Sequence, residues 1–353
     1  KGIRCGDLIY DTVVRFSKKI PTLNLKSFSY FLSLHRSINQ ITYFLNIPNI
    51  PNFQKVFFSQ AVYTYHGIPL RVFLKKSSKV FTSGNFTQMF KLHSFDDIYM
   101  METTKSYKNI LKKIDFNNKI IQNSLKVFSS RFEGKDDTGY IKLMKSNPYV
   151  DYNVQFDNYQ SIDGVLFLHD FYDAHKLYGE VIFNDFYEWA IFTLDIIREY
   201  NLKIAIKPHP YQIPESLRFQ EKIKEIYKDL IWLNPLISNI SLFKRNIKFG
   251  ISHHGTVIPE LAFFGIKCIY CAENPVSAFN IGFFAKNRNQ YKDLILNVNS
   301  LKNCNNLKTE VAKYYYIHYI HKSSDYMIKR KVVDGINIKN INRMNMKTKE
   351  LLN

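Results

Sequence analysis

The sequence of 353 residues contains few cysteines. Cys5, Cys268, Cys271 and Cys304 are too few to form a disulfide framework in a chain of this size. Cys268 and Cys271 have C-x-x-C spacing, but no second pair completes a zinc site, and both lie in an apolar strand pattern. We therefore expect small buried thiols, reduced as in a cytosolic protein.

Long hydrophobic runs are also missing. No stretch approaches the roughly 18 residues that a membrane-spanning helix needs, and no segment resembles the apolar part of a signal peptide. Internal repeats and low-complexity linkers are absent as well, and the length suits two domains of ordinary size. Because the chain begins at Lys1 without a methionine, we expect further residues upstream.

Acidic residues are scarce, with 30 Asp and Glu against 49 Lys and Arg, which gives a net charge of +19. Such an excess fits nucleic acid, an anionic membrane surface or small anionic substrates. No basic run interleaved with aromatics resembles a nucleic-acid-binding module, so we expect no nucleic-acid partner. Basic residues are concentrated near the end, from Lys329 to Lys349. This stretch fits an anionic inner-membrane surface, and a solvated tail is the alternative.

Strands and helices alternate clearly from Gly164 onward. Apolar runs at residues 165–168, 204–206 and 249–251 predict buried strands, and the segments between them have helical spacing. Short connections between such elements are typical of a parallel sheet covered by helices. We therefore predict an α/β fold of two Rossmann-like domains that face a cleft. The predicted parts are residues 1–160, residues 161–325 and a basic helix or tail at 326–353.

A basic corner with two prolines follows one predicted strand. Lys207, Pro208, His209 and Pro210 come directly after the apolar residues 204–206. The prolines hold the backbone extended, so His209 leaves the strand at a fixed angle. Its imidazole can donate a hydrogen bond to a phosphate or a carboxylate, and Lys207 adds a positive charge. The alternative is a buried turn in which the histidine satisfies a backbone carbonyl.

A short segment of small polar residues and histidines connects the strand at residues 247–251 with a helix. It consists of Ser252, His253, His254, Gly255 and Thr256. Free N–H groups at the start of that helix, together with the hydroxyl groups, predict a cradle for a phosphate. Glu260 is either a ligand of ribose hydroxyls or an acid that complements the helix dipole. Ser277, which follows the next strand, is expected to close the same pocket.

Two further segments carry carboxylates. The loop after residues 165–168 contains His169, Asp170, Asp173 and His175, which predict a substrate-orienting wall, a metal site or structural caps. At the other end of the chain, Asp7 and Asp11 lie where a loop enters a helix. Asp7 is either a helix cap or a base that faces the cleft, and Asp11 is its rival.

Taken together, these motifs resemble bacterial glycosyltransferases of GT-B type that build capsule and O-antigen polysaccharides. The combination of His209 and Pro210 with the segment from Ser252 to Glu260 is similar to enzymes that use CMP-activated acidic sugars. The resemblance implies that His209 binds the donor phosphate and that Ser252, Thr256 and Glu260 help to hold the nucleotide. It also implies that Asp7 serves as the general base. His253 and His254 occupy positions where such enzymes often have small residues.

The resemblance implies a metal-independent transferase that needs no cofactor and lies at the inner face of the cytoplasmic membrane. Its donor is expected to be a nucleotide sugar. The preferred donor is a CMP-activated acidic sugar such as Kdo, pseudaminic or sialic acid. Its acceptor is a lipid-linked capsule or O-antigen glycan. Asp170 and Asp173 are further candidates for the base. Two alternatives remain open: a transferase with a UDP-hexose, GDP-hexose or CDP-alcohol donor, and a metal-dependent hydrolase centred on His169, Asp170, Asp173 and His175.

Overall fold

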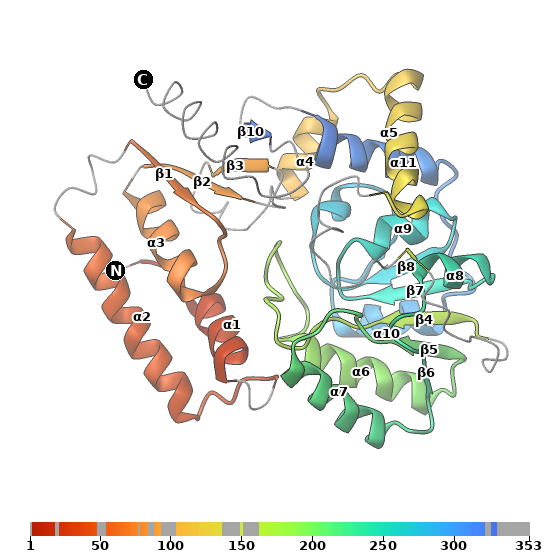
Figure 1. The fold of residues 1–353 in the computed structure, drawn as a ribbon, viewed down its shortest axis with the longest axis horizontal. Coiled ribbons are helices and arrows are strands. Elements are labelled where there is room, and N and C mark those ends of the chain that lie inside the picture. The colour runs from red at the N-terminus through yellow and green to blue at the C-terminus, as the bar shows by residue number, and fades with distance from the viewer. Residues whose placement is uncertain are drawn as a thin grey trace.

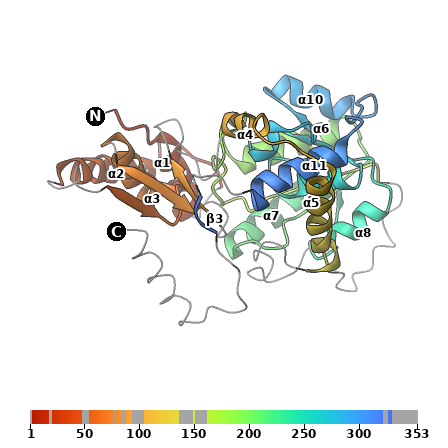
Figure 2. The ribbon, with the colours of Figure 1, turned by 90° about the horizontal axis from the view of Figure 1, so that it is seen from above.

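The computed structural model describes residues 2–17, 21–47, 54–76, 78–83, 88–92, 104–135, 149–150, 162–321 and 326–329. Two sheets organise these residues into a smaller and a larger lobe (Figure 1). Viewed from above, the two lobes lie side by side (Figure 2). No helix among the described residues is long and apolar enough to cross a membrane.

The larger lobe is built on a parallel sheet of six strands. In spatial order these are β6 (Ile231–Trp232), β5 (Ile204–Lys207), β4 (Gly164–Phe167), β7 (Phe249–Ser252), β8 (Lys267–Tyr270) and β9 (Phe283–Phe284). Parallel neighbours need crossover connections. The connecting segments contain α6 (Phe186–Glu199), α7 (Pro214–Ile226), α8 (Asn239–Lys244), α9 (Val257–Phe263) and η4 (Pro275–Ala278), and α10 (Arg288–Leu296) follows β9.

Alternate residues of the central strand face two different cores. Val165 and Phe167 belong to one hydrophobic cluster, whereas Leu166 and Leu168 belong to the other. This alternation follows from the two-residue period of a strand, and burial on both faces explains why the strand reads as a continuous apolar run. Helices therefore cover both faces of the sheet (Figure 1). The predicted α/β fold class is confirmed.

The smaller lobe has a mixed sheet of four strands in the order β1, β2, β3, β10. Its elements are α1 (Gly6–Ser17), α2 (Phe28–Asn46), β1 (Lys55–Phe58), α3 (Tyr63–Lys75), β2 (Lys79–Ser83), β3 (Gln88–Leu92) and β10 (Tyr326–Lys329). β1 pairs with β2 in parallel, but β3 is antiparallel to both of its neighbours. The segment expected as a helix or tail from residue 326 therefore begins with a strand. Residues 330–353 lie outside the described residues.

Two helices from the first 160 residues pack against the larger sheet. α4 (Thr104–Leu111) and α5 (Asn118–Ser130) supply the buried Tyr107 and Phe128 to the same core as Val165. They are followed by η2 (Arg131–Glu133), and they pack beside α11 (Leu307–Tyr315) and the π-helical turn η5 (Tyr316–Ile320). The domain boundary at residue 160 remains a prediction, but the core of the larger lobe includes residues that precede it.

Candidate functional site

Four imidazoles surround Phe186 at the carboxyl end of the larger sheet. Phe186 begins α6, is buried, and stacks on His169 with ring centroids 4.6 Å apart. The rings of His253, His254 and His175 contact it at 5.0, 5.5 and 5.8 Å. Two of these histidines follow β4 and two follow β7, which are neighbouring parallel strands. We call these four residues the histidine cluster.

Two side-chain hydrogen bonds to one backbone carbonyl join the loops that carry the cluster. Ser252 Oγ donates to the carbonyl oxygen of His254 at 2.7 Å, and His169 Nε2 donates to the same oxygen at 3.0 Å. Gly255 has φ of 113°, and a Cβ atom there would lie 3.5 Å from the ring of His169. Because L side chains rarely adopt this φ, the glycine is what lets the chain turn between β7 and α9.

Several nitrogens of the cluster have no hydrogen-bond partner among the described residues. They are both ring nitrogens of His253, both of His254, and Nε2 of His175. Burial lowers the pKa of His253, His254 and His169 well below the ordinary range, and neighbouring imidazoles lower it further. The three rings are therefore neutral at pH 7, and a neutral imidazole carries one donor and one acceptor. An unpaired buried polar atom is costly, which points to a ligand or water at these nitrogens.

The corner after β5 lies against the same edge of the sheet. His209 Nδ1 lies 2.6 Å from the carbonyl oxygen and 3.1 Å from the backbone nitrogen of Tyr211. Nε2 takes part in none of the hydrogen bonds found among the described residues, so it is the nitrogen open to a ligand. Burial lowers the pKa of His209; the contact with Tyr211 opposes this shift, and the charge of Lys207 adds to it.

Lys207 is buried below this corner. Its Nζ donates to the carbonyl oxygen of Pro235 at 3.2 Å. Burial lowers its pKa to about 8, although the charge of Glu260 opposes the shift. Glu260 is itself engaged, because it accepts hydrogen bonds from Tyr149 at 2.5 Å and Asn239 at 3.2 Å and lies 3.5 Å from Arg131. A role of Glu260 on a ribose therefore stays a prediction, and in the structure its carboxylate links η2, α8 and α9.

The remaining predicted donor residues lie around these loops. Thr256 precedes α9, is exposed, and makes no side-chain cap hydrogen bond. Ser277 completes a capping box with Asn274 at η4, so it stabilises its own turn. Pro210 is half-buried beside His209. Their contact with a nucleotide remains a prediction.

Asp170 holds two loops together. Its Oδ1 accepts from the backbone nitrogen of Tyr172, and its Oδ2 accepts from that of Ile213, both at 2.9 Å. The second contact ties the β4 loop to the His209 corner. Asp173 is exposed, and it accepts from the backbone nitrogen of Ala174 at 2.9 Å. These contacts favour the structural alternative for both residues.

Asp7 lies in a buried ion pair. Arg71 from α3 donates to both of its carboxylate oxygens, at 2.7 and 2.5 Å, and also to the carbonyl oxygen of Arg4 at 2.8 Å. Burial raises the pKa of Asp7, but the hydrogen bond and charge of Arg71 outweigh it and hold the pKa below its ordinary range. A carboxylate held this way is a weak base.

Asp11 and His175 meet across the two lobes. His175 Nδ1 donates to Asp11 Oδ1 at 3.2 Å, and both side chains are buried. Asp11 lies four residues after Asp7, so both carboxylates occupy one face of α1. Tyr10 of the same helix donates to Asp185 Oδ2 at 2.6 Å, which fixes α1 against the start of α6.

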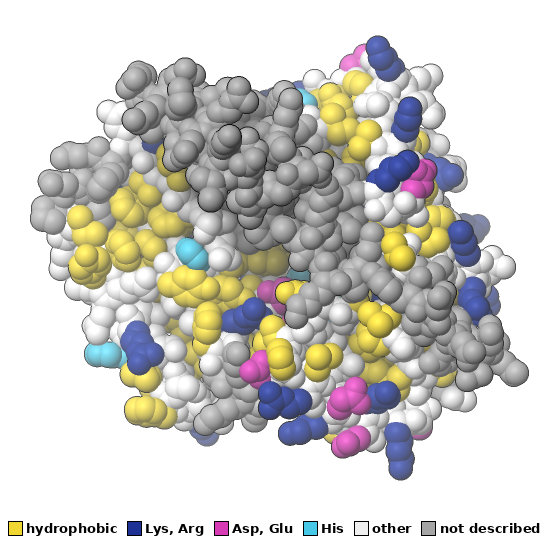
Figure 3. Space-filling view, viewed as in Figure 1, with side chains coloured by type: hydrophobic (Ala, Val, Ile, Leu, Met, Phe, Trp, Pro, Cys, Tyr) yellow, Lys and Arg dark blue, Asp and Glu magenta, His cyan; other side chains and the backbone are white. Residues whose placement is uncertain are grey.

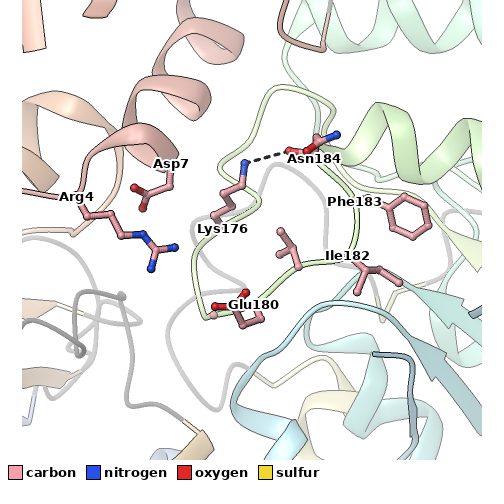
Figure 4. Close-up of a pocket in the computed structure, with 9 residues that line it drawn as sticks. Arg4, Asp7, Lys176, Glu180, Ile182, Phe183 and Asn184 are labelled. Carbon is pink, nitrogen blue, oxygen red and sulfur yellow. Dashed lines mark hydrogen bonds between the residues drawn. The ribbon is translucent and has the colours of Figure 1, made fainter. Parts of the chain in front are cut away.

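A cavity of about 220 Å³ lies beside this junction. Arg4 and Asp7 line it from α1 and the residues before it, and Lys176, Glu180 and Asn184 line it from the loop that follows His175 (Figure 4). Lys176 Nζ donates to the carbonyl oxygen of Asn184 at 3.3 Å. Since ligand pockets typically begin near ~300 Å³, this cavity suits a part of a substrate, such as one sugar ring.

The metal alternative for His169, Asp170, Asp173 and His175 finds no support among the described residues, and the cysteines are buried or partly buried free thiols. Within the described ranges, no three His, Cys, Asp or Glu residues are arranged to hold a metal ion. All four cysteines are free, and Cys268 and Cys271 are buried, as the apolar pattern predicts. Burial raises the pKa of the Cys268 thiol, so it remains protonated.

Sequence reasoning missed Arg71, Lys176 and Phe186. Arg71 sits inside an apolar helix pattern, where one buried cation among hydrophobic residues is a signal for a buried acidic partner. Lys176 directly follows His175, which the sequence analysis did single out. Phe186 reads as an ordinary core aromatic, and no sequence signal distinguishes it.

No protein-family model matches the chain, and no curated protein matches it. Several solved structures are similar in shape. A UDP-GlcNAc 2-epimerase from Methanocaldococcus jannaschii, solved with UDP-GlcNAc and UDP, is 14% identical with a TM-score of 0.36, covering 82% of this chain and 81% of its own. The Thermosulfurimonas dismutans KpsC, a beta Kdo 2,4 transferase, is 8% identical with a TM-score of 0.42, covering 73% and 78%. We infer no activity from similarity at this level.

Proposed function

We propose that the protein is a metal-independent glycosyltransferase that moves a sugar from a nucleotide donor to a lipid-linked capsule or O-antigen glycan. One observation carries the proposal. The loops after β4 and β7 bring together imidazoles with unpartnered nitrogens at the carboxyl edge of a parallel sheet, beside a cavity shared with the other lobe. Ligands of open α/β sheets bind outside this edge.

The donor side of the proposal rests on the His209 corner and the histidine cluster. His209 presents Nε2 from a backbone held by two prolines, and Lys207 lies below it. Neutral imidazoles donate N–H groups to phosphate oxygens without a metal ion. Burial of a diphosphate or monophosphate at this edge would also satisfy the nitrogens of His253 and His254. The preferred donor is a CMP-activated acidic sugar, in keeping with the sequence resemblance.

The acceptor side rests on the cavity and the pair formed by Asp11 and His175. Deprotonation of an acceptor hydroxyl needs a base within hydrogen-bond reach. Asp7 is held by Arg71, and both oxygens of Asp170 accept backbone hydrogen bonds. Asp11 Oδ1 accepts from His175 Nδ1 and so fixes the ring with Nε2 as the nitrogen that can accept a proton, and we assign the base to His175 Nε2 with Asp11 as its positioning residue. The nitrogen is buried, and opening between the lobes would admit the hydroxyl.

Membrane association is the third part of the proposal. A lipid-linked acceptor requires contact with the inner face of the cytoplasmic membrane, and the net charge of +19 favours an anionic surface. The basic residues near the chain end, from which the sequence analysis predicts this contact, lie mostly outside the described residues. The metal-dependent hydrolase gains no support from the geometry of the described residues.

A thermal-shift panel of CMP, CDP, UMP, UDP, GDP and ADP, with and without EDTA, tests the donor. We expect CMP to stabilise the wild-type protein, EDTA to leave the shift unchanged, and His209→Ala to abolish it. His35→Ala is the matched control, because His35 is an exposed histidine of α2. A preference for UDP or GDP would move the donor to an ordinary hexose. Destabilisation by EDTA with no nucleotide response would overturn the transferase and support the metal site.

A further inference from the structure

Helix α2 has apolar side chains on two opposite faces. Its inward face contributes Ile41 to the core of the smaller lobe, where Ile68 and Leu70 of α3 are completely buried. Its outward face carries Phe28, Phe31, Ile38 and Tyr43, which are 81%, 56%, 50% and 66% exposed. Phe28, Phe31 and Ile38 are spaced by three and seven residues, so they form one stripe along the helix. We call these four residues the α2 stripe.

A helix normally turns its apolar side chains to the core and its polar ones to solvent, so exposed apolar side chains on the outward face of α2 need an explanation. α2 lies at the outer edge of the smaller lobe, away from the larger one (Figures 1 and 2). Leu25, which precedes the helix, adds another side chain that is 60% exposed. Several large exposed apolar side chains on one helix indicate a contact with a protein or a membrane.

The charge around the stripe is of one sign. From Thr12 to Phe95 the sequence contains no Asp or Glu, but eleven Lys or Arg. Lys26 and Arg36 are exposed before and within α2. The carboxylates of Asp7 and Asp11 are held by Arg71 and His175. In Figure 3, hydrophobic side chains gather over the smaller lobe at the left, and the acidic side chains in view lie at the junction or over the larger lobe.

We propose that the α2 stripe docks the protein onto an anionic lipid bilayer. Phe28, Phe31 and Ile38 insert at the boundary between headgroups and acyl chains, and Lys26 and Arg36 contact lipid phosphates. α2 lies in the plane of the membrane, as amphipathic interfacial helices do, because it is not apolar enough to cross.

Charge complementarity selects the lipid surface over other occupants. A second copy that docked through the same face would bring a surface of the same positive charge, which is unfavourable. Nucleic acid would match the charge, but Leu25 and Ile38 offer nothing on which a base can stack. Acyl chains accept aromatic and aliphatic side chains alike, while anionic headgroups match the basic residues.

The inference rests on the proposed function for its setting, a lipid-linked acceptor, and it deepens that proposal by naming the surface that reaches the membrane. The test of docking needs no sugar transfer, so the docking proposal and the proposed function can fail independently. Vesicle binding that persists without any nucleotide response would leave docking intact and remove the transferase. A nucleotide response without vesicle binding would do the reverse.

Sedimentation of the full chain with sucrose-loaded vesicles tests the docking. One set contains about 30% phosphatidylglycerol in phosphatidylcholine, and the other contains phosphatidylcholine alone. We expect binding to the anionic set only, and a loss of at least about fivefold in Phe28→Ser/Phe31→Ser. Leu217→Ser/Ile226→Ser is the matched control, since it removes two exposed apolar side chains from α7 of the larger lobe. This control should bind as the wild type does.

Three results would overturn the proposal. One is wild-type binding by Phe28→Ser/Phe31→Ser, and another is equal binding to neutral vesicles. The third is self-association of the wild type without lipid that this variant abolishes, since the stripe would then contact a second copy. Phe31→Trp supplies an independent probe. In anionic vesicles we expect the fluorescence emission of the new tryptophan to shift to the blue and to be quenched by brominated lipid. Unchanged melting curves show that the surface variants fold.

Discussion

The imidazole of His175 donates a hydrogen bond to the carboxylate of Asp11 across the junction between the two lobes, at 3.2 Å. Asp11 belongs to α1 of the smaller lobe, and His175 to the loop after β4 of the larger one. The pair therefore exists only while the lobes are in contact. The other ring nitrogen of His175, Nε2, has no hydrogen-bond partner among the described residues. A base assembled in this way couples closure of the lobes to its own orientation.

Asp11→Asn should reduce the rate of sugar transfer by about 100-fold, since general base catalysis contributes at least that much. An amide can donate to Nδ1 as well as accept from it, so the tautomer with an accepting Nε2 is no longer fixed, and kcat should fall while KM for the donor stays close to its wild-type value. The measurement is steady-state kinetics with the donor that the nucleotide panel selects. Glu221→Gln, at an exposed carboxylate of α7, is the control. An Asp11→Asn enzyme with wild-type kcat would remove Asp11 from the mechanism.

Acid should destabilise the protein through the histidine cluster. The folded state depresses the pKa of His169, His253 and His254, whereas the unfolded chain takes up protons near pH 6.5. The unfolded state then binds more protons at and below pH 6.5, so the free energy of unfolding decreases as the pH is lowered. Each histidine contributes up to about 1.4 kcal/mol per pH unit.

His253→Phe should make this acid dependence shallower by one proton. Because neither nitrogen of His253 has a partner among the described residues, an aromatic ring of similar shape should leave stability at pH 7.5 unchanged or higher. The same variant should lose the nucleotide-induced thermal shift. Urea titrations from pH 5 to 7.5 measure the slope, with His35→Phe as the exposed control. A strongly destabilised His253→Phe protein that still binds nucleotide would show that the ring is structural.

Lys207 should give a dependence of the same sign in an alkaline window. Its pKa in the folded protein is about 8, against an ordinary value of 10.5. Below pH 8 the lysine is charged in both states, and its burial destabilises the fold in full. Between pH 8 and 10.5 the unfolded state binds more protons, so the free energy of unfolding rises with pH, by up to about 3 kcal/mol.

Lys207→Met should lack this alkaline rise. The difference between wild-type and variant unfolding free energies, measured at pH 7.5, 9 and 10.5, isolates the lysine from the tyrosines and cysteines that titrate nearby. Lys203→Met, an exposed lysine just before β5, should behave as the wild type does. A constant difference between wild type and Lys207→Met would show that Lys207 keeps an ordinary pKa.

The sequence predicts the larger sheet and the position of the site on it, but not the contacts that complete the site. Buried strands such as residues 165–168 read as apolar runs, and parallel strands place their carboxyl ends at one edge. The local pattern therefore leads to His169, His209 and the segment after Ser252. Asp7 with Arg71 and Asp11 with His175 are separated by 64 and 164 positions, and no local period records such pairs. The pairing of β10 with β3 in the smaller sheet cannot be predicted for the same reason, because the two strands lie far apart in the sequence.

The ion pair of Asp7 and Arg71 decides between a base and a structural anchor. Asp7→Asn leaves a buried guanidinium without its carboxylate and should destabilise the protein by about 3–5 kcal/mol. Asp7→Asn/Arg71→Met removes both charges and should recover most of that loss, because a buried ion pair adds little beyond an apolar pair of similar size. If Asp7 is an anchor, the double variant also regains sugar transfer. If Asp7 is the base that the resemblance implies, the double variant is stable but inactive, and the assignment to His175 is then wrong.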